Sequence, residues 1–308
     1  MDLLVSKLSP IRRWAVSYYY RKLFNRYAAD ICRAKEAFND ERSARVLDGL
    51  LSAYTTKNND GAQLFTRMAD LSGITPGPRT LPKQYRLPGI NYEIREADNL
   101  YFLPDLFSFS QSVVLLDGGA FVGDTLQLAS RVLGERLHYA YAFEPNPKSF
   151  DTLKKVAEDL PFPTRLYQNA ICSVTELSHF SERGSYTRLD NRGTLLVQTI
   201  EIGSFLEQLE KTPGALLPNF IKLDIEGCEP EALISMSGYL RRNKPDLAIS
   251  TYHHVEDLWQ MPLLLRAICP DYQLYLRHHS NYFTETVLYA TVANHISPSE
   301  ERGANHER

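Results

Sequence analysis

A run of apolar residues that ends in an acid and a glycine-rich turn is the feature that most constrains the fold of this chain. Residues 113–125 read VVLLDGGAFVGDT, and an amphipathic stretch continues to Leu133. This order predicts a buried strand, a tight turn and a helix. Glycine at such a turn lets the backbone approach a ligand closely and take positive φ. In open α/β sheets, ligands bind at the carboxyl ends of the strands, beside the free N–H groups of a helix N-terminus.

A second acid follows the next apolar run. Residues 138–143 read HYAYAF, and Glu144 comes directly after them. Only an ionised carboxylate offers two acceptor oxygens for the two hydroxyls of a ribose. The order of turn, strand and acid therefore predicts a ligand that contains a nucleoside.

Two ligands fit this pattern, NAD and S-adenosylmethionine. The dinucleotide fingerprint is G-x-G-x-x-G, whereas the glycines here are Gly118, Gly119 and Gly123, with Asp117 directly before them. A carboxylate at that place is unfavourable for a pyrophosphate but suits the ammonium of a methionine moiety. We therefore favour S-adenosylmethionine as the cofactor. An NAD(P)-dependent oxidoreductase is the alternative, and a non-catalytic protein that keeps the fold is a third possibility.

Composition and charge narrow the possible classes. A formal net charge of −3 provides no overall basic field, so we expect no nucleic-acid partner. No apolar run approaches the roughly 20 residues that span a bilayer. The cysteines form no C-x-x-C pair and predict neither a zinc site nor a disulfide framework, which favours a cytoplasmic protein. They are Cys32, Cys172, Cys228 and Cys269.

The chain divides into a helical N-terminal part and an α/β part. Residues 1–84 contain helix-compatible runs at Leu3–Arg33 and Glu41–Tyr54, then a proline- and glycine-rich linker. Residues 85–295 alternate between strand and helix patterns, and the polar residues 296–308 predict a disordered tail. Alternation of this kind is typical of a mostly parallel sheet with helices on both faces. We expect strands at 113–117, 139–144, 164–168, 195–201, 219–224, 246–251, 272–276 and 286–292, and helices at 124–133, 147–159, 203–211, 230–242 and 257–268.

A third acid closes another short apolar strand. Residues 219–231 read NFIKLDIEGCEPE, which predicts a strand, a glycine turn and the start of a helix. Asp224 would lie at the same edge of the sheet as the two acids above, so we predict a functional role for it. Glu229 and Glu231 suit the positive N-terminus of the helix as capping charges.

The ordered motifs resemble those of FkbM-type methyltransferases, which are S-adenosylmethionine-dependent enzymes of the class I fold. The resemblance covers about residues 85–292. It implies a Rossmann-like, seven-stranded, mostly parallel sheet with an antiparallel last strand, here with an N-terminal helical extension, and O-methylation as the usual reaction. The residues that carry it are LLDGGAFVGDT (115–125), YAFEPNP (141–147), QNAICS (168–173), FIKLDIEGCEPEAL (220–233), KPDLAISTYHHVEDLWQMP (244–262) and YLRHHSNYFTETVLYAT (275–291).

The resemblance also implies a cofactor site. It places the glycine-rich turn against the methionine part of the donor, Glu144 on the ribose, and the segment after the third strand near the adenine. Asp224 would lie near the reacting methyl group. The cofactor-binding candidates are Asp117, Gly119, Ala120, Gly123, Thr125, Glu144, Asn169, Ala170 and Asp224.

Methyl transfer to a hydroxyl needs alignment of the acceptor and a base for the departing proton. Because histidine titrates near neutral pH, we predict His253 or His254 as the base, with Asp224 orienting the base or the acceptor. Neighbouring histidines point apart in an extended strand, and no H-x-H or H-x-x-H spacing occurs, so we expect no metal. The substrate-binding candidates, which are polar residues after strands, are Glu226, Arg277 and His278.

Basic and aromatic residues are interleaved in the segment 12–27, RRWAVSYYYRKLFNRY. Such a helix could lie on anionic lipid. Its aromatic residues do not fall on one helical face, so we favour packing on the catalytic domain or on a second subunit. We expect a small-molecule or glycan acceptor; peripheral membrane contact and a homo-oligomer stay open. The expected reaction is methylation of a hydroxyl on a sugar, a glycan, a glycolipid or a secondary metabolite.

Overall fold

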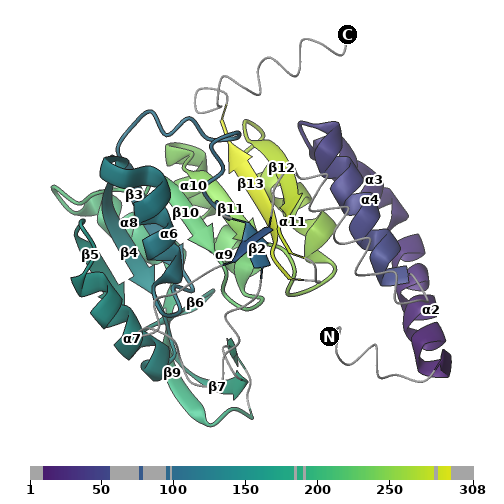
Figure 1. Ribbon diagram of the computed structural model, residues 1–308, viewed down its shortest axis with the longest axis horizontal. Helices are drawn as coiled ribbons and strands as arrows, with labels where there is room; N and C mark the ends of the chain where they lie inside the picture. Colours follow the sequence, from purple (N-terminus) through teal and green to yellow (C-terminus); the bar gives the residue numbers. More distant parts are fainter. Residues whose placement is uncertain are drawn as a thin grey trace.

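Seven strands form the central sheet of the computed structural model, which describes residues 10–55, 76–78, 95–97, 99–183, 186–189, 192–280 and 284–292. Their order is β12-β13-β11-β10-β3-β4-β5 (Figure 1). β13 is antiparallel to both of its neighbours, whereas the other pairs are parallel, which confirms the expected sheet. The strands are β3 (Val113–Gly118), β4 (Leu137–Phe143), β5 (Thr164–Tyr167), β10 (Phe220–Leu223), β11 (Asp246–Ser250), β12 (Gln273–His278) and β13 (Thr286–Thr291).

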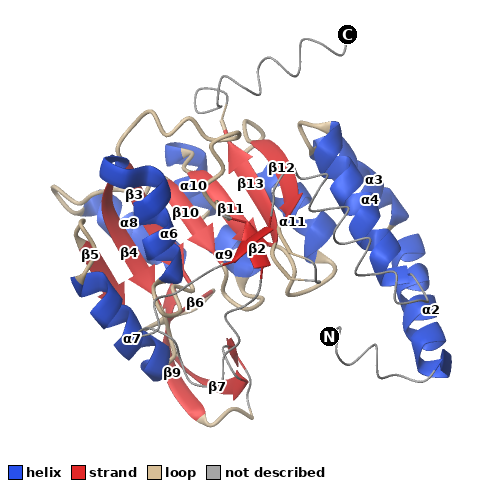
Figure 2. Cartoon of the chain, viewed as in Figure 1, coloured by secondary structure: helices blue, strands red, loops and turns tan. Residues whose placement is uncertain are grey.

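Helices cover both faces of this sheet, as expected (Figure 2). α6 (Asp124–Leu133) and α7 (Pro147–Glu158) lie on one face, and a short 3₁₀ turn, η2 (Gly134–Arg136), leads from α6 into β4. The other face carries α8 (Ile202–Lys211), α9 (Glu229–Ser235), α10 (Ser237–Asn243) and α11 (Asp257–Ile268). The prediction of a single helix at 230–242 is therefore wrong, because α9 ends and α10 begins on either side of Met236. Serine and glycine flank this break, and both are weak helix formers.

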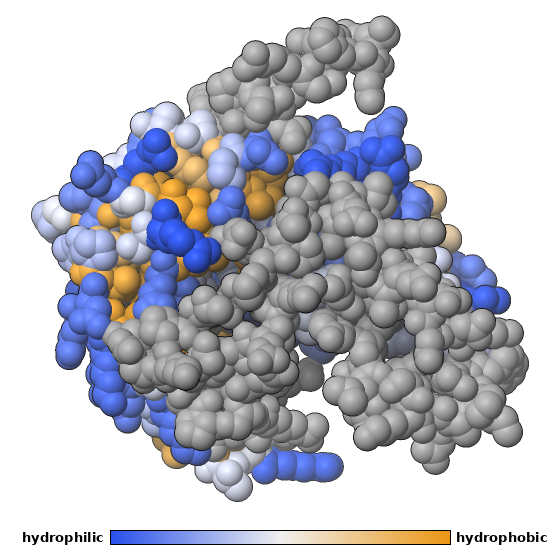
Figure 3. Space-filling model, viewed as in Figure 1, coloured by the Kyte–Doolittle hydropathy of each residue, from blue (hydrophilic) through white to orange (hydrophobic). Residues whose placement is uncertain are grey.

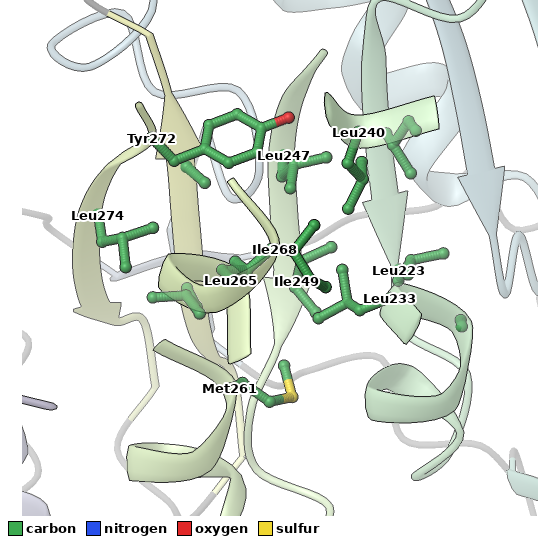
Figure 4. Packing of buried hydrophobic residues seen from close by; sticks show 14 of the residues in the cluster. Leu223, Leu233, Leu240, Leu247, Ile249, Met261, Leu265, Ile268, Tyr272 and Leu274 are labelled. Atoms are coloured by element: carbon green, nitrogen blue, oxygen red, sulfur yellow. The ribbon is translucent and has the colours of Figure 1, made fainter. Parts of the chain in front are cut away.

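Alternate strand residues feed two separate cores. In β10, Ile221 and Leu223 belong to the core under α8 to α11, while Phe220 belongs to the core under α6. Successive strand side chains point to opposite faces, so a short apolar strand can serve both cores. Figure 4 shows Leu223 beside Leu233 of α9 in the first of these cores.

The segment 99–109, for which the sequence predicts no helix or strand, completes the second core. The rings of Phe102 and Phe107 lie 5.2 and 5.1 Å from that of Phe220, measured between centroids. This segment therefore covers the face of β10 that helices leave open, and it carries Tyr101 to the carboxyl edge of the sheet.

The N-terminal helices α2 (Pro10–Arg26), α3 (Ala28–Ala37) and α4 (Glu41–Thr55) lie at the β12 end of the sheet, next to α11 (Figure 1). The backbone N–H groups of Leu274 and Leu276 in β12 donate to Asn39 Oδ1 and Ser43 Oγ, each at 2.8 Å. These bonds satisfy donors of an edge strand that would otherwise face water. The helix-compatible run Leu3–Arg33 corresponds to two helices in the described residues, with Tyr27 between them, and the second continues to Ala37.

A second, smaller sheet lies beside the first, in the order β6-β9-β7-β8. Its strands are β6 (Ala170–Cys172), β7 (Leu177–Arg183), β8 (Tyr186–Leu189) and β9 (Leu195–Glu201). The strand expected at 195–201 is thus β9 of this sheet, and the segment 175–195, for which the sequence predicts no strand, contains β7 and β8. The buried Thr199 holds the sheet together: its hydroxyl donates to Val174 O at 2.7 Å and accepts from Glu176 N at 2.9 Å.

Most of the linker at 73–89 and the tail at 296–308 lie outside the described residues. β1 (Pro76–Pro78) belongs to that linker and pairs antiparallel with β2 (Arg95–Ala97), which follows it. Among the helices that the structure describes, none combines the length and apolar character needed to cross a bilayer. In the view of Figure 3, the side chains of α3 and α4 that the grey atoms leave visible are mostly hydrophilic.

Candidate active site

Three acids meet at the carboxyl edge of the neighbouring strands β10, β3 and β4. Asp117 of β3 stands opposite Lys222 in the register with β10. Asp224 follows β10 directly, and Glu144 follows β4 directly. The backbone N–H of Asp224 donates to Gly118 O at 3.0 Å, which ties the end of β10 to the turn after β3. The structure therefore brings the three predicted acids to one edge of the sheet.

Gly119 is needed because another backbone occupies the space of a side chain. It has a φ of +77°, and a Cβ built on it would lie 1.8 Å from the carbonyl oxygen of Asp224. The N–H groups of Gly119 and Ala120 both donate to Phe143 O, at 3.0 and 2.9 Å. The turn thus joins the ends of β10, β3 and β4 into one rigid unit.

The second half of the turn leads into α6. Gly123 is the N-cap residue at φ +85°, and its missing Cβ leaves room for Val156 of α7, whose Cγ1 would be 2.8 Å away. Phe121 takes a φ of +48°, a strained conformation for a residue with a side chain. Thr125 is 2% exposed in the first turn of α6. The predicted turn residues therefore line one continuous loop from strand to helix.

Glu144 is attached to this loop. Its Oε2 accepts a hydrogen bond from Phe121 N at 2.9 Å, and its Oε1 accepts one from Asn146 N at 2.8 Å. The carboxyl group is buried, and burial raises its pKa to about 8 despite these two bonds. The acid is thus held rigidly between the glycine turn and the start of α7.

A buried lysine, which the sequence analysis did not single out, lies beneath the turn. Lys222 Nζ is 3.0 Å from Asp117 Oδ1 and donates to the carbonyl oxygens of Gly118 and Gly119, at 3.1 and 2.8 Å. Burial acts to lower the pKa of Lys222, but the carboxylates of Asp117 and Asp224 outweigh it and raise the pKa above its usual value. Asp117, which the sequence suggested as a partner for the ammonium of the methionine moiety, therefore already has a cationic partner within the protein. A lysine inside the apolar strand FIKL is the sequence signal for such a pair.

Two phenols hold the side chain of Asp224. Tyr101 donates to Oδ2 at 3.0 Å, and Tyr252 donates to Oδ1 at 3.0 Å. Burial alone would raise the pKa of Asp224, but His253, Lys222 and the two phenols together lower it below the ordinary value. Asp224 is thus an ionised, oriented carboxylate. Tyr252 lies beside the predicted histidines, but Tyr101 comes from the distant segment 99–109 and has no local signal in the sequence.

His253 is enclosed by acids. Its Nε2 lies 3.4 Å from Asp224 Oδ1 and 3.5 Å from Glu226 Oε2, and its Nδ1 lies 3.0 Å from Glu229 Oε1. Burial would lower the pKa of this imidazole, but Glu229 and the other carboxylates raise it to about 10. The ring is therefore protonated at neutral pH, which is the opposite of what a base requires. The prediction that His253 is the base stays a prediction, and its charge state argues against it.

The turn after Asp224 carries the other candidates. Glu229 is fully buried, and its carboxylate accepts from Ile225 N at 2.7 Å and Gly227 N at 2.9 Å, so it ties the turn after β10 to the start of α9. Glu226 takes a φ of +59°, and its side chain is 26% exposed. His254 is exposed, and its ring lies against Gly227, where a Cβ would be 2.8 Å from Nε2.

Asn169 and Ala170 lie at the junction of the two sheets. Asn169 follows β5, and its side-chain amide donates to Gln198 O of β9 at 3.1 Å. Ala170 is buried at the start of β6. Both residues stand at the same carboxyl edge as Glu144, whose N–H donates to Tyr167 O at 3.1 Å. Their expected contact with adenine stays a prediction.

Arg277 and His278 end β12, the outermost strand, and β13 and β11 lie between β12 and β10. Arg277 is 1% exposed; its guanidinium donates to Asp40 Oδ2 at 2.6 Å and to Ser43 Oγ at 3.0 Å. His278 is fully buried, and its Nδ1 lies 2.8 Å from Thr286 Oγ1. Arg277 thus fastens the N-terminal helices to β12, and His278 joins β12 to β13. The expectation that these two residues bind substrate stays a prediction, and both side chains already have partners within the protein.

The structure also brings together groups that could hold a cation. One ligand atom each of Asp224, Glu229 and His253 lie within 4.8 Å of one another. The spacing of these residues in the sequence matches no ligand motif, so sequence reasoning could not find the grouping. The expectation that no metal is used stays a prediction.

The chain is similar to one described protein family and to several solved structures. The family model described as "Methyltransferase FkbM domain" matches residues 117–283. The crystal structure of the methyltransferase FkbM from Methylobacillus flagellatus KT is 22% identical with a TM-score of 0.62, and the match covers 87% of this chain. The match spans only 59% of that longer protein. An O-methyltransferase from Bacillus cereus, solved in complex with SAH, is 13% identical with a TM-score of 0.39 over 76% of this chain and 91% of its own. No curated protein matches the chain.

The solved FkbM structure shares the fold, and the family model, which matches residues 117–283, accounts for more than half of the chain. The motifs that it spans are those that place Asp117, Glu144 and Asp224 at one edge of the sheet. The chain therefore belongs to the FkbM family of methyltransferases.

Proposed function

We propose that this protein transfers a methyl group from S-adenosylmethionine to a hydroxyl of a sugar, a glycan, a glycolipid or a secondary metabolite. The observation that carries the proposal is the attachment of Glu144 to the glycine turn through Phe121 N, at 2.9 Å, on the edge where Asp224 also lies. A carboxylate and a glycine turn in this relation suit a ribose and the chain attached to it.

The residues present fit the donor. Each oxygen of the Glu144 carboxylate accepts one backbone hydrogen bond and keeps a second acceptor position, so the group can also take the two ribose hydroxyls. The turn of Gly119, Ala120 and Gly123, completed by Thr125, would hold the methionine part. Asn169 and Ala170 would face the adenine. Asp117, already paired with Lys222, would act by shaping the turn.

The turn after β10, where we place the methyl acceptor and which we call the acceptor side, is rich in hydrogen-bonding groups. Asp224 with its two phenols and Glu226 line the turn after β10, and such groups suit a ligand with several hydroxyls. The bound sulfonium supplies an activated methyl group, whose bond to sulfur breaks as a bond to the acceptor oxygen forms. The protein must align that oxygen and remove its proton.

We assign the role of general base, which takes the proton of the acceptor hydroxyl, to His254. It is exposed and reachable from solvent, whereas His253 is enclosed and held protonated at a pKa of about 10. His253 would then serve as a fixed cation that orients Asp224 and Glu226. Removal of a general base lowers kcat by about 10²- to 10⁴-fold, so His254→Ala should lose that much and His253→Asn should act chiefly through stability.

The test is a methylation assay with labelled donor against a panel of sugars, glycolipids and polyketide alcohols. Transfer of label to a hydroxyl oxygen, sharply reduced in His254→Ala, supports the proposal. Transfer to nitrogen or carbon, or tight binding of NAD without binding of the methyl donor, would refute it.

A further inference from the structure

Two cysteines that are far apart in the sequence lie in contact next to the candidate active site. Cys172 ends β6 and Cys228 is the N-cap residue of α9, and their Sγ atoms are 3.7 Å apart. Both are free thiols; Cys172 is buried and Cys228 is partly exposed. A disulfide requires a separation of about 2.05 Å, so the sulfur atoms need to approach by only about 1.7 Å.

The pair bridges two elements of the candidate site. Cys228 follows Gly227 directly, in the turn whose N–H groups bind Glu229, and Asp224 begins that turn. Cys172 follows Ile171, whose Cδ1 would lie 2.9 Å from a Cβ on Gly118. β6 therefore packs against the glycine turn, and Cys228 lies in the turn that holds the acceptor-side acids.

We propose that Cys172 and Cys228 form an oxidisable dithiol, and that a peroxide converts it to a disulfide that links β6 to the turn after β10 and weakens donor binding. The effect on donor binding rests on the function proposed above. The formation of the disulfide itself does not.

The chemistry needs only the two thiols and the peroxide. The thiolate of Cys172 attacks hydrogen peroxide, gains one oxygen and forms a sulfenic acid, and one water leaves. Cys228 then attacks that sulfur, the S–S bond forms, and the sulfenic oxygen leaves as a second water. Two electrons pass from the thiols to the peroxide.

The electrostatics fit these two roles. The hydrogen bond from Cys228 lowers the pKa of Cys172, although burial opposes it, whereas the same bond and burial raise the pKa of Cys228. The contact of the two sulfurs at 3.7 Å, in which either thiol can donate, lets one thiol resolve the oxidation of the other; the directions of the two pKa shifts favour Cys172 as the attacking thiol.

The experiment uses the full chain with Cys32→Ser, because Cys32 is exposed and would join molecules to one another. The protein is treated with hydrogen peroxide, blocked, digested and analysed by mass spectrometry. We expect a peptide that links Cys172 to Cys228 and disappears on reduction with dithiothreitol. Affinity for S-adenosylmethionine, measured by calorimetry before and after oxidation, should fall on the order of tenfold and return on reduction.

Two variants serve as controls. Cys172→Ala should bind the donor like the parent when reduced, and peroxide should leave its affinity unchanged. Cys269→Ala, which removes a buried cysteine outside the pair, should keep the oxidation response. Sulfinic acids in place of the linked peptide would overturn the dithiol, and a linked protein with unchanged donor affinity would overturn the regulatory effect. If the reduced parent binds no donor while the linked peptide still forms, the function proposed above fails and the dithiol stands.

Discussion

The ammonium of Lys222 lies 3.0 Å from Oδ1 of Asp117, and the two side chains are 2% and 0% exposed. Lys222 also donates to the carbonyl oxygens of Gly118 and Gly119. One buried cation thus neutralises the acid of the first motif and fixes the turn after β3. Asp117, which the sequence suggested as a contact of the cofactor, therefore also stabilises the turn through its pairing with Lys222.

Lys222→Met should destabilise the protein strongly, because it leaves the buried carboxyl of Asp117 without its counter-ion. Breaking a buried pair at one partner costs about 3–5 kcal/mol. The double variant Asp117→Asn/Lys222→Met should recover part of that loss. Urea unfolding of the parent, the two single variants and the double variant gives the coupling energy. Strictly additive losses would show that the two side chains do not stabilise each other.

Gly119→Ala should be far more damaging than its backbone angle alone explains. Gly214 provides a matched control, since it has the same φ of +77° with nothing within 4 Å of a Cβ, whereas a Cβ on Gly119 would lie 1.8 Å from Asp224 O. Gly214→Ala should cost about 1–2 kcal/mol for the left-handed backbone. Gly119→Ala should cost a further ~3 kcal/mol or more for the collision. Equal shifts of Tm in the two variants would mean that β3 and β10 do not approach this closely.

His253 should make stability depend on pH. Its pKa is about 10 in the folded protein, against an ordinary value of 6.5, because the carboxylates of Glu229, Asp224 and Glu226 stabilise the protonated ring. The ring therefore contributes stability that is fully present below about pH 6.5 and is lost as the pH rises through 10. The Tm difference between the parent and His253→Asn should be largest near pH 6 and shrink towards pH 10. A difference that is constant over this range would contradict the protonated, acid-bound ring.

Arg277→Met should loosen the N-terminal helices rather than impair acceptor binding. Arg277 is the buried partner of Asp40 and Ser43, and those contacts hold the start of α4 against β12. We expect a lower Tm and faster proteolysis within residues 10–55, with the acceptor KM unchanged. A raised KM at unchanged Tm would restore the substrate-binding role that the sequence suggested.

The sheet and the three acids could be predicted from the sequence because their causes are local. Each acid directly follows a short apolar run, and the carboxyl ends of adjacent parallel strands share one edge. Glu144 and Asp224 were therefore located by position alone. The same reasoning placed Arg277 at a strand end but could not show that Asp40, from the N-terminal helices, already occupies its guanidinium.

The remaining features depend on contacts between distant segments. Tyr101 reaches Asp224 across 123 residues, and Cys172 meets Cys228 across 56. No spacing rule encodes such pairs, because the tertiary fold sets them. The charge of His253 shows the same dependence. The pair of neighbouring histidines suggested a base, but the carboxylates of Asp224 and Glu229, which stabilise the protonated ring, come from a distant part of the sequence.

Donor affinity should rise with pH below about 8. Burial raises the pKa of Glu144 to about 8, so the carboxyl is largely protonated at neutral pH before the donor binds. Ribose hydroxyls donate most strongly to the ionised form, so the affinity should rise by up to about tenfold per pH unit from pH 6 towards 8 and then level off. Calorimetry in buffers of different ionisation enthalpy should also show proton release at pH 7. Glu144→Gln should remove the pH dependence.

The most direct measurement is titration of the protein with S-adenosylmethionine by calorimetry, comparing the parent with Glu144→Ala. A matched control is Glu158→Ala, which alters an exposed acid at the end of α7. The account predicts that the parent and the control bind the donor alike and that Glu144→Ala loses binding while it remains folded. Unchanged donor affinity in a folded Glu144→Ala protein would contradict the assignment of this edge of the sheet as the donor site.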